Sequence, residues 1–410
     1  MVESTYRARA LLPQLELALS ESPVAILVGP RQSGKSTLAR QLVPAGSYTT
    51  LDDPEPLAFA TADPDGFIAR FKERCAIDEV QKVPDLMRAI KASVDRDRRP
   101  GRFLLTGSAD VLVVPRVAES LAGRMRLLTL WPFAEAELAG SAGDFVDRLF
   151  DDGEIRADAV VTRADAVDRA VRGGYPEIIQ MPISSRSSWY ESYIAAVTLR
   201  DIRDIVDVRG LTQLPGLLRL LAARTCAVLN IAELSRISGI PQTTVARYLS
   251  LLQLTFLLRL MPSWSGSLAK RLTRHPKIAI CDTGLAAHLQ GVETARLAVD
   301  QHLAGALLEN YVLMELEKQS SWSRTRPALY HFRSGSGDEV DIVMERRDGS
   351  VVGIEVKASV GVTAADFRGL RALSLLVKRK FVRGIVLHPG RNVVGFSERL
   401  SAVPLSALWT

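Results

Sequence analysis

The chain of 410 residues has few cysteines and no long run of apolar residues. Its three cysteines, Cys75, Cys226 and Cys281, are far apart, and none belongs to a Cys-x-x-Cys pair. This spacing excludes a disulfide framework and a cysteine-ligated zinc site, and it fits a reducing compartment, so we expect a cytoplasmic location. No apolar run approaches the roughly 18 residues that cross a bilayer. Charges recur through the N-terminal segment, so we expect neither a signal peptide nor a membrane partner.

The composition is that of a folded protein with a basic bias. Apolar residues make up 47% of the chain, which is enough to build the cores of two to four domains. The net charge is +6, a value that is compatible with nucleic-acid binding and is equally typical of an ordinary basic protein. Charge alone therefore leaves both classes open.

The most informative segment is the glycine-rich loop 29–36, which reads G-x-x-x-x-G-K-S. An apolar run at 24–28 predicts a buried strand before it, and a helical pattern follows at 36–42. In this context, backbone N–H groups would surround phosphate oxygens, Lys35 would reach the β- and γ-phosphates, and the Ser36 hydroxyl would ligate Mg²⁺. The expected nucleotide-contacting residues of this segment are Gly29, Pro30, Arg31, Gln32, Ser33, Gly34, Lys35, Ser36 and Thr37.

Two adjacent acids end the next apolar run, 75–79. Alone, such a pair is typical of any strand end. After a phosphate loop, Asp78 would hold Mg²⁺ through water and Glu79 would polarise the attacking water. A kinase needs no such Glu, so the pair favours hydrolysis. A third strand at 102–105 leads to Ser108, which either contacts the γ-phosphate or the attacking water, or merely belongs to a turn.

Arg124 precedes a further apolar stretch at 127–130. An arginine here would stabilise the transition-state charge at the site of a neighbouring subunit, as an arginine finger does. A simple surface arginine is the equal alternative, so the expected homo-oligomer, a ring, depends on which of the two holds.

Five motifs occur in order: Gly-Pro-Arg-Gln-x-Gly-Lys-Ser, Ile-Asp-Glu-Val-Gln-Lys, Leu-Thr-Gly-Ser, Leu-Ala-Gly-Arg and Trp-Pro-Phe-x-x-x-Glu-Leu. They lie at 29–36, 77–82, 105–108, 121–124 and 131–138, and further matches lie at 173–177 and 199–202. The set resembles the prokaryotic AAA+-like ATPases that carry a C-terminal domain of unknown function, over nearly the whole chain. The resemblance implies an ASCE-type ATPase core and assembly into a ring.

The middle of the chain predicts a helical connector and then a helix-turn-helix. Asn230 would cap a helix at 231–238, Gly239 would make the turn, and Pro241 would open a second helix that ends at Gln253. Apolar strands at 256–261 and 277–281 would form a wing, with the basic segment 270–277 between them. If this module binds DNA, the contacting residues would be Gln242, Thr243, Thr244 and Arg247, and the basic wing would hold phosphates. The alternative is a module that only packs domains or subunits together.

From residue 303 onward the pattern reads helix, three strands, helix and strand, which is the core order of PD-(D/E)xK nucleases. A hairpin at 347–350 would place Asp341 beside Glu355 on neighbouring strands. Residues two apart on a strand share a face, so Lys357 would point the same way as Glu355. The acids would bind Mg²⁺ or Mn²⁺, with Glu309 of the preceding helix as a further ligand. A half-buried hairpin with outward charges is the plain alternative, and the resemblance includes such a nuclease-like domain.

These observations predict an α/β protein with four parts: a P-loop ATPase domain (1–135), a helical lid or connector (136–205), a winged-helix-like domain (206–290) and a PD-(D/E)xK nuclease-like domain (291–410). The leading hypothesis is an ATP-hydrolysing protein, using ATP with Mg²⁺, coupled to a metal-dependent nuclease acting on DNA. The alternative is an ATP-switched DNA- or protein-binding ATPase whose nuclease-like domain does not cut. The predicted catalytic residues are Glu79, Arg124, Asp341, Glu355 and Lys357, and the predicted metal ligands are Ser36, Asp78, Glu309, Asp341 and Glu355.

Overall fold

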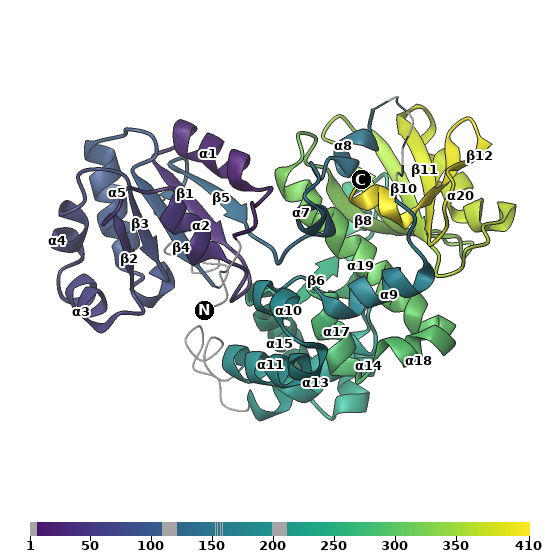
Figure 1. The fold of residues 1–410 in the computed structure, drawn as a ribbon, viewed down its shortest axis with the longest axis horizontal. Coiled ribbons are helices and arrows are strands. Elements are labelled where there is room, and N and C mark those ends of the chain that lie inside the picture. The colour runs from purple at the N-terminus through teal and green to yellow at the C-terminus, as the bar shows by residue number, and fades with distance from the viewer. Residues whose placement is uncertain are drawn as a thin grey trace.

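The structure is a computed structural model that describes residues 6–108, 121–151, 153, 155, 157, 159–198 and 211–410. The motif at 199–202 lies outside the described residues. The N-terminal sheet and its helices form one lobe, and all later elements gather in a second, larger lobe (Figure 1). Within the described ranges, no helix is both long enough and apolar enough to cross a bilayer.

The N-terminal lobe contains a five-stranded parallel sheet in the order β2-β3-β4-β1-β5. Its strands are β1 (Val24–Val28), β2 (Tyr48–Thr50), β3 (Cys75–Asp78), β4 (Phe103–Gly107) and β5 (Met125–Thr129). Its helices are α1 (Leu12–Glu21), α2 (Lys35–Gln41), α3 (Pro54–Ala62), α4 (Pro64–Ala69), η1 (Val80–Lys82) and α5 (Leu86–Arg96).

Strand β1 is apolar at every position because helices cover both faces of the sheet. Val24, Ile26 and Val28 pack in the same buried cluster as residues of α5. Ala25 and Leu27 point the other way and pack with residues of α1 and α2. The uninterrupted apolar run therefore reflects a central parallel strand rather than a half-exposed one.

The chain between the two large sheets is mostly helical, as predicted, and a short turn at 239–241 joins α14 to α15. Asn230 caps α14 by accepting a hydrogen bond from the Glu233 N–H at 3.1 Å, and Gly239 ends that helix with φ +70°. Pro241, predicted as the first helical residue, is the N-cap of α15, so the helix begins one residue later than predicted, at Gln242. The helices of this region are α7 (Glu135–Ala139), α8 (Phe145–Arg148), α9 (Arg163–Arg172), α10 (Pro176–Gln180), α11 (Ile183–Ala196), η4 (Leu211–Gln213), α13 (Leu214–Ala222), α14 (Ile231–Ser238), α15 (Gln242–Leu254), α16 (Leu268–Thr273), α17 (Thr283–Gln290) and α18 (Thr294–Val299).

Strands β6 (Leu258–Met261) and β7 (Lys277–Ile280) form the expected antiparallel pair after α15. This wing does not stand free. Ser263 forms a bridge with His331, and the Trp264 N–H donates to the His331 carbonyl at 2.6 Å. The wing is therefore joined to the sheet of the C-terminal region.

The C-terminal region contains a six-stranded mixed sheet in the order β12-β13-β11-β10-β9-β8, with α19 and α20 packed against it. The helix–strand order predicted from 303 onward is the observed order, and two further strands follow. The elements are α19 (Gln301–Trp322), β8 (Ala328–Arg333), β9 (Glu339–Glu345), β10 (Val351–Val356), η5 (Ala364–Phe367), α20 (Arg368–Val377), η6 (Lys378–Lys380), β11 (Phe381–His388), β12 (Val394–Ser397), β13 (Leu400–Pro404) and η7 (Leu405–Leu408).

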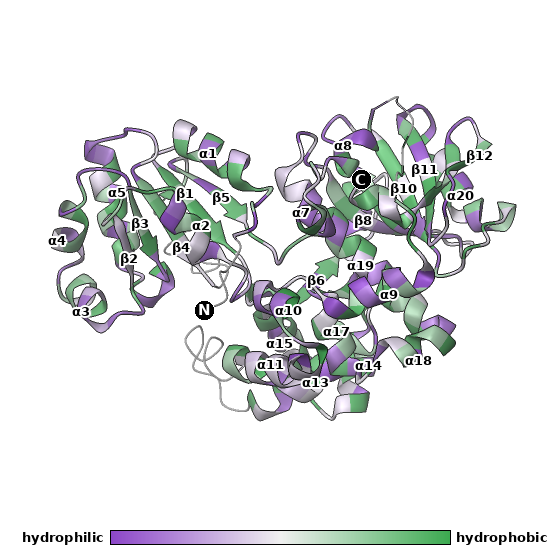
Figure 2. Cartoon of the chain, viewed as in Figure 1, coloured by the Kyte–Doolittle hydropathy of each residue, from purple (hydrophilic) through white to green (hydrophobic). Residues whose placement is uncertain are grey.

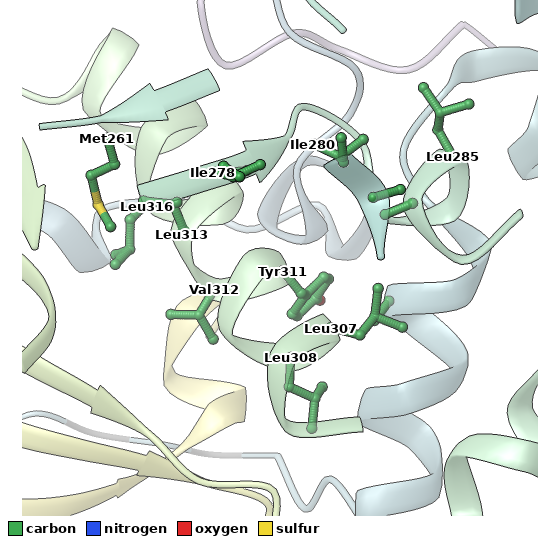
Figure 3. Packing of buried hydrophobic residues seen from close by; sticks show 14 of the residues in the cluster. Met261, Ile278, Ile280, Leu285, Leu307, Leu308, Tyr311, Val312, Leu313 and Leu316 are labelled. Atoms are coloured by element: carbon green, nitrogen blue, oxygen red, sulfur yellow. The ribbon is translucent and has the colours of Figure 1, made fainter. Parts of the chain in front are cut away.

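Helix α19 lies at the centre of the larger lobe and buries side chains on several sides, both apolar ones such as Leu308 and polar ones such as Asn310. Figure 3 shows Leu307, Tyr311 and Leu316 of α19 near Ile278 and Ile280 of β7. The buried cluster around α19 extends from Ala136 to Trp409 and so crosses the boundaries expected near 205 and 290. Hydrophobic residues likewise concentrate on the strands of both large sheets, with hydrophilic ones on the outer helices and loops (Figure 2).

Candidate functional site

The phosphate loop connects β1 to α2, as the sequence predicts. Gly29 and Gly34 have φ values of +149° and +95°, which side chains rarely adopt. A Cβ atom on Gly29 would lie 2.2 Å from the Leu130 carbonyl oxygen, so the first position of the loop requires glycine for a steric reason as well. The Lys35 ammonium lies inside the loop and donates to the carbonyls of Gly29 at 2.9 Å and Pro30 at 2.8 Å.

Tyr48, which the sequence did not single out, lies close to both predicted Mg²⁺ contacts, Ser36 and Asp78. The Tyr48 hydroxyl donates a hydrogen bond to Asp78. Burial, together with the neighbouring Asp78 carboxylate, raises the pKa of Tyr48 to about 12. The Ser36 hydroxyl, in the first turn of α2, and the Asp78 carboxylate, at the end of β3, are thus both close to Tyr48.

The order of the strands explains why Ser108 meets the acids. Strand β4 lies between β1 and β3, so the residues after β4 lie between the phosphate loop and the acidic pair. Thr106 donates a hydrogen bond to Asp78, and the Ser108 hydroxyl donates to Glu79 Oε2 at 3.2 Å. Glu79 adopts a left-handed backbone (φ +57°), which is uncommon for this residue type and often marks functional positions. Gln81, which the sequence did not predict, also donates to Glu79.

Arg124 lies at the opposite end of the strands from the loop. It immediately precedes β5, and the register pairs Val24 with Met125, whereas the loop follows Val28. The intervening strand length is about 16 Å for five residues at about 3.3 Å each. The Arg124 guanidinium pairs with Asp95 at 2.6 Å. The structure therefore does not bring Arg124 to the loop of its own chain.

The predicted carboxylates of the C-terminal region do come together. The antiparallel register pairs Ile342 with Ile354, which places Asp341 opposite Glu355. Asp341 Oδ2 accepts from the Val356 N–H at 3.0 Å. Lys357 is turned toward Asp366, with 3.5 Å between the charged atoms.

Glu309 of α19 lies near the two carboxylates, and the Lys277 side chain lies among the acids. We call this site the carboxylate pocket (Glu309, Asp341, Glu355 and Lys277). Its ammonium lies 2.6 Å from Glu309 Oε1 and 3.3 Å from Asp341 Oδ1, and only 8% of the Lys277 side chain is exposed. Lys277 is the last residue of the basic segment 270–277, which would hold phosphates if the module bound DNA, but Lys277 is buried in the pocket and is not available for that role. As the first residue of β7, Lys277 points into the pocket because the wing is docked against α19.

Burial and neighbouring charges shift the pKa values of Glu309, Glu355 and Lys277. Burial, and then the neighbouring Asp341, raises the pKa of Glu309 to about 7, although Lys277 opposes the shift. The pKa of Glu355 is also raised, by burial first and by Asp341 second. Burial acts to lower the pKa of Lys277, but Glu309 and Asp341 outweigh it and raise that pKa, so the lysine stays cationic.

The pocket does not fit a metal ion as it stands. Among the residues that the structure describes, no group of three or more His, Cys, Asp or Glu side chains is placed to hold one. Where a divalent cation would need oxygen ligands on several sides, the Lys277 ammonium contacts Glu309 and Asp341 instead. The predicted metal ligands of the C-terminal region are thus close together, but the cation that contacts Glu309 and Asp341 is the Lys277 ammonium.

Comparisons with known proteins support a nucleotide-binding role for the N-terminal lobe. Residues 21–139 match the family model described as an AAA domain, and the strand order and phosphate loop are those of a P-loop ATPase. The N-terminal lobe is therefore a P-loop ATPase domain. Residues 163–296 and 304–408 match two further family models, each described as a domain of unknown function (DUF8612 and DUF4143).

The chain belongs to the family of two mycobacterial proteins that are similar to it over nearly its whole length. They are the uncharacterized protein Rv2008c of Mycobacterium tuberculosis and the uncharacterized protein Mb2031c of Mycobacterium bovis. Each is 31% identical over 400 residues, which is 97% of this chain and 83% of the relative. The comparison with solved structures finds a Walker-type ATPase of Pyrococcus abyssi at 14% identity and a TM-score of 0.37, covering 68% of this chain and 94% of that one.

Proposed function

We propose that this ATPase is a nucleotide-switched nucleic-acid-binding protein whose nuclease-like domain does not cut while Lys277 occupies the carboxylate pocket. In the ATPase site, Lys35 would bind the phosphates, Ser36 and Asp78 would hold Mg²⁺, and Glu79 would orient the attacking water with Ser108. These roles are supported by the contacts that join Ser36, Tyr48 and Asp78 and those that join Ser108 and Glu79.

The observation that carries the proposal is the position of the Lys277 ammonium. Metal-dependent cleavage needs a cation that accepts both water and a phosphodiester oxygen as ligands. An ammonium supplies charge and three donors but no open coordination site. With its charge held between Glu309 and Asp341, Lys277 satisfies the acids without creating a nucleophile.

A nucleic-acid partner is supported by the helix-turn-helix and its surroundings. Gln242, Thr243 and Arg247 are exposed at the start of the second helix, α15, where such modules contact base edges and phosphates. Lys270 and Arg274, on and just after α16, are exposed nearby in the chain and would add phosphate contacts. DNA is the proposed ligand, since this docking geometry suits a major groove.

The geometry also supports a second candidate, a metal-dependent nuclease. Glu309, Asp341 and Glu355 are brought together by three different elements, in the order expected of such enzymes. If DNA or ATP moved the wing, Lys277 would leave the pocket and the acids would be open to Mg²⁺ or Mn²⁺.

A ring of several copies of the chain is also proposed. Because Arg124 cannot reach the phosphate loop of its own chain, a role in hydrolysis requires a neighbouring copy.

One experiment separates the two functions. The wild-type protein, Asp341→Ala and Lys277→Met are incubated with single-stranded, duplex and branched DNA and with RNA, with Mg²⁺ or Mn²⁺, and with or without ATP. We expect ATP-dependent DNA retention in a filter or anisotropy assay, unchanged by Asp341→Ala, and no cleavage. Metal-dependent cleavage by the wild-type protein that disappears in Asp341→Ala would establish the nuclease instead. Lys72→Met, which removes an exposed lysine of the ATPase domain outside both the pocket and the helix-turn-helix, is the control.

A further inference from the structure

Arg9, in the segment before α1, is a buried arginine that contacts the phosphate loop, Trp131 and Glu137 of α7 at once. Its Nη1 donates to the Ser33 carbonyl at 2.7 Å, its Nη2 donates to the Trp131 carbonyl at 2.6 Å, and its Nε donates to Glu137 Oε1 at 2.9 Å. The guanidinium also lies 4.5 Å from the centre of the Phe133 ring. Only 6% of the residue is exposed, so solvent screens these contacts weakly.

The contact with Ser33 matters because Ser33 lies inside the phosphate loop. Its neighbours Gln32 and Gly34 both have left-handed backbones, with φ +61° and +95°. A loop that presents successive N–H groups to an anion must turn its carbonyls the other way. The Ser33 carbonyl needs a donor on that far side, and Arg9 provides it.

Glu137 fixes Arg9 in turn. This carboxylate accepts hydrogen bonds from Arg9 and from the backbone N–H groups of Ala10 and Ala134, each at 2.9 Å. Its side chain is 2% exposed, so the pair is a buried, fully hydrogen-bonded ion pair. Arg9 therefore has one orientation available to it.

The segment that holds Arg9 is also held by the larger lobe. The Phe133 carbonyl accepts from Lys318 at 3.0 Å, and the Glu135 N–H donates to Glu315 at 2.8 Å. Both partners belong to α19, which also carries Glu309 of the carboxylate pocket. Arg9 thus lies where the phosphate loop, the connector 131–137 and the larger lobe meet.

We propose that Arg9 is a positioning residue for nucleotide binding. It acts through the Ser33 carbonyl, orienting the loop so that its N–H groups face the phosphates, and Glu137 keeps Arg9 in place. Lysine cannot replace it, because a single ammonium cannot donate along the three fixed directions that the guanidinium uses.

The test compares Arg9→Lys and Glu137→Gln with Arg126→Lys and Glu21→Gln. Arg126 and Glu21 form an exposed ion pair on the same domain, 58% and 47% exposed, and serve as the matched control. The readouts are KM and kcat for ATP hydrolysis and the Kd of a fluorescent ADP analogue. Arg9→Lys is expected to raise KM and Kd about tenfold or more, the effect of one lost charge-assisted hydrogen bond, with kcat within about twofold. Glu137→Gln keeps an acceptor and is expected to raise both by about threefold.

A merely structural role would lower the melting temperature and the active fraction while KM and Kd stayed unchanged. Unchanged KM and Kd in a folded Arg9→Lys protein would overturn the proposal. If circular dichroism showed that Arg9→Lys does not fold, the milder Glu137→Gln variant decides: a raised KM and Kd supports the proposal, and wild-type values overturn it. Both control variants are expected to keep the wild-type constants.

Discussion

Replacing Lys277 with methionine removes the one cation that contacts both Glu309 and Asp341 among the described residues while keeping most of the side-chain volume. Breaking a buried ion pair from one side typically costs about 3–5 kcal/mol, because a charge is left buried without compensation. Here Glu309 and Asp341 are 16% and 17% exposed, so water reaches them in part. We therefore expect the free energy of unfolding to fall by about 2–3 kcal/mol, at or below the lower limit of that range.

The assay is thermal unfolding of the full chain, measured by calorimetry at pH 7.5 without divalent cations. A loss of 2–3 kcal/mol corresponds to a fall of roughly 4–12 °C in the transition of the larger lobe, at about 2–4 °C per kcal/mol for a unit of this size. The transition of the ATPase domain is expected to stay in place. Lys270→Met, on the exposed side of α16, is expected to change the free energy of unfolding by less than about 0.5 kcal/mol.

A double-variant cycle separates the ion pair from simple packing. Glu309→Gln removes one buried negative charge, so the Lys277→Met, Glu309→Gln protein is expected to recover part of the stability that Lys277→Met loses. Two results would refute the reasoning: a Lys277→Met protein as stable as Lys270→Met, or additive losses in the double variant. Either would mean that the ammonium does not compensate the acids of the pocket.

Three further predictions follow from the contacts of the two lobes. Lys35→Ala is expected to lower ATP turnover at least about a hundredfold, since a phosphate-binding charge is lost; full turnover in a steady-state phosphate-release assay would reject the site. Glu79→Gln is expected to keep nucleotide affinity and lose hydrolysis, which equilibrium binding and single-turnover measurements distinguish. Burial lowers the pKa of His331 to about 4, below its unfolded value of roughly 6.5, so the protonated imidazole is favoured only in the unfolded state. Stability is therefore complete above about pH 6.5 and falls as the pH drops toward 4; chemical denaturation of wild type and His331→Asn should diverge in that window, and parallel pH profiles would contradict the assignment.

Local patterns in the sequence were sufficient for most of the elements. The loop 29–36, with apolar residues before it and a helical period after it, gave β1 and α2 because phosphate loops carry their own turn chemistry. The cap Asn230 and the turn residue Gly239 located α14 to the residue, since both act on the backbone within a few positions. The hairpin at 347–350 likewise set the register that places Asp341 opposite Glu355.

Contacts between distant segments could not be read from those patterns. Lys277 looked like one more basic residue of a wing, and only the docking of that wing on α19 turns it into the pocket. Arg9 lies 128 residues from Glu137, and nothing in either neighbourhood shows that they pair. Tyr48 stood on a short strand with no motif, yet the parallel pairing of β2 with β3 brings it to Asp78.

The sequence by itself determined the ATPase loop, the order of the elements and the residues that form the acidic pairs, because these depend on local backbone chemistry and on hydrophobic period. The tertiary structure decided what those residues face. It placed Ser108 against Glu79, kept Arg124 at the end of the strands opposite the phosphate loop and put the Lys277 ammonium between Glu309 and Asp341. Such contacts depend on how separate elements pack, which no short segment of the chain encodes.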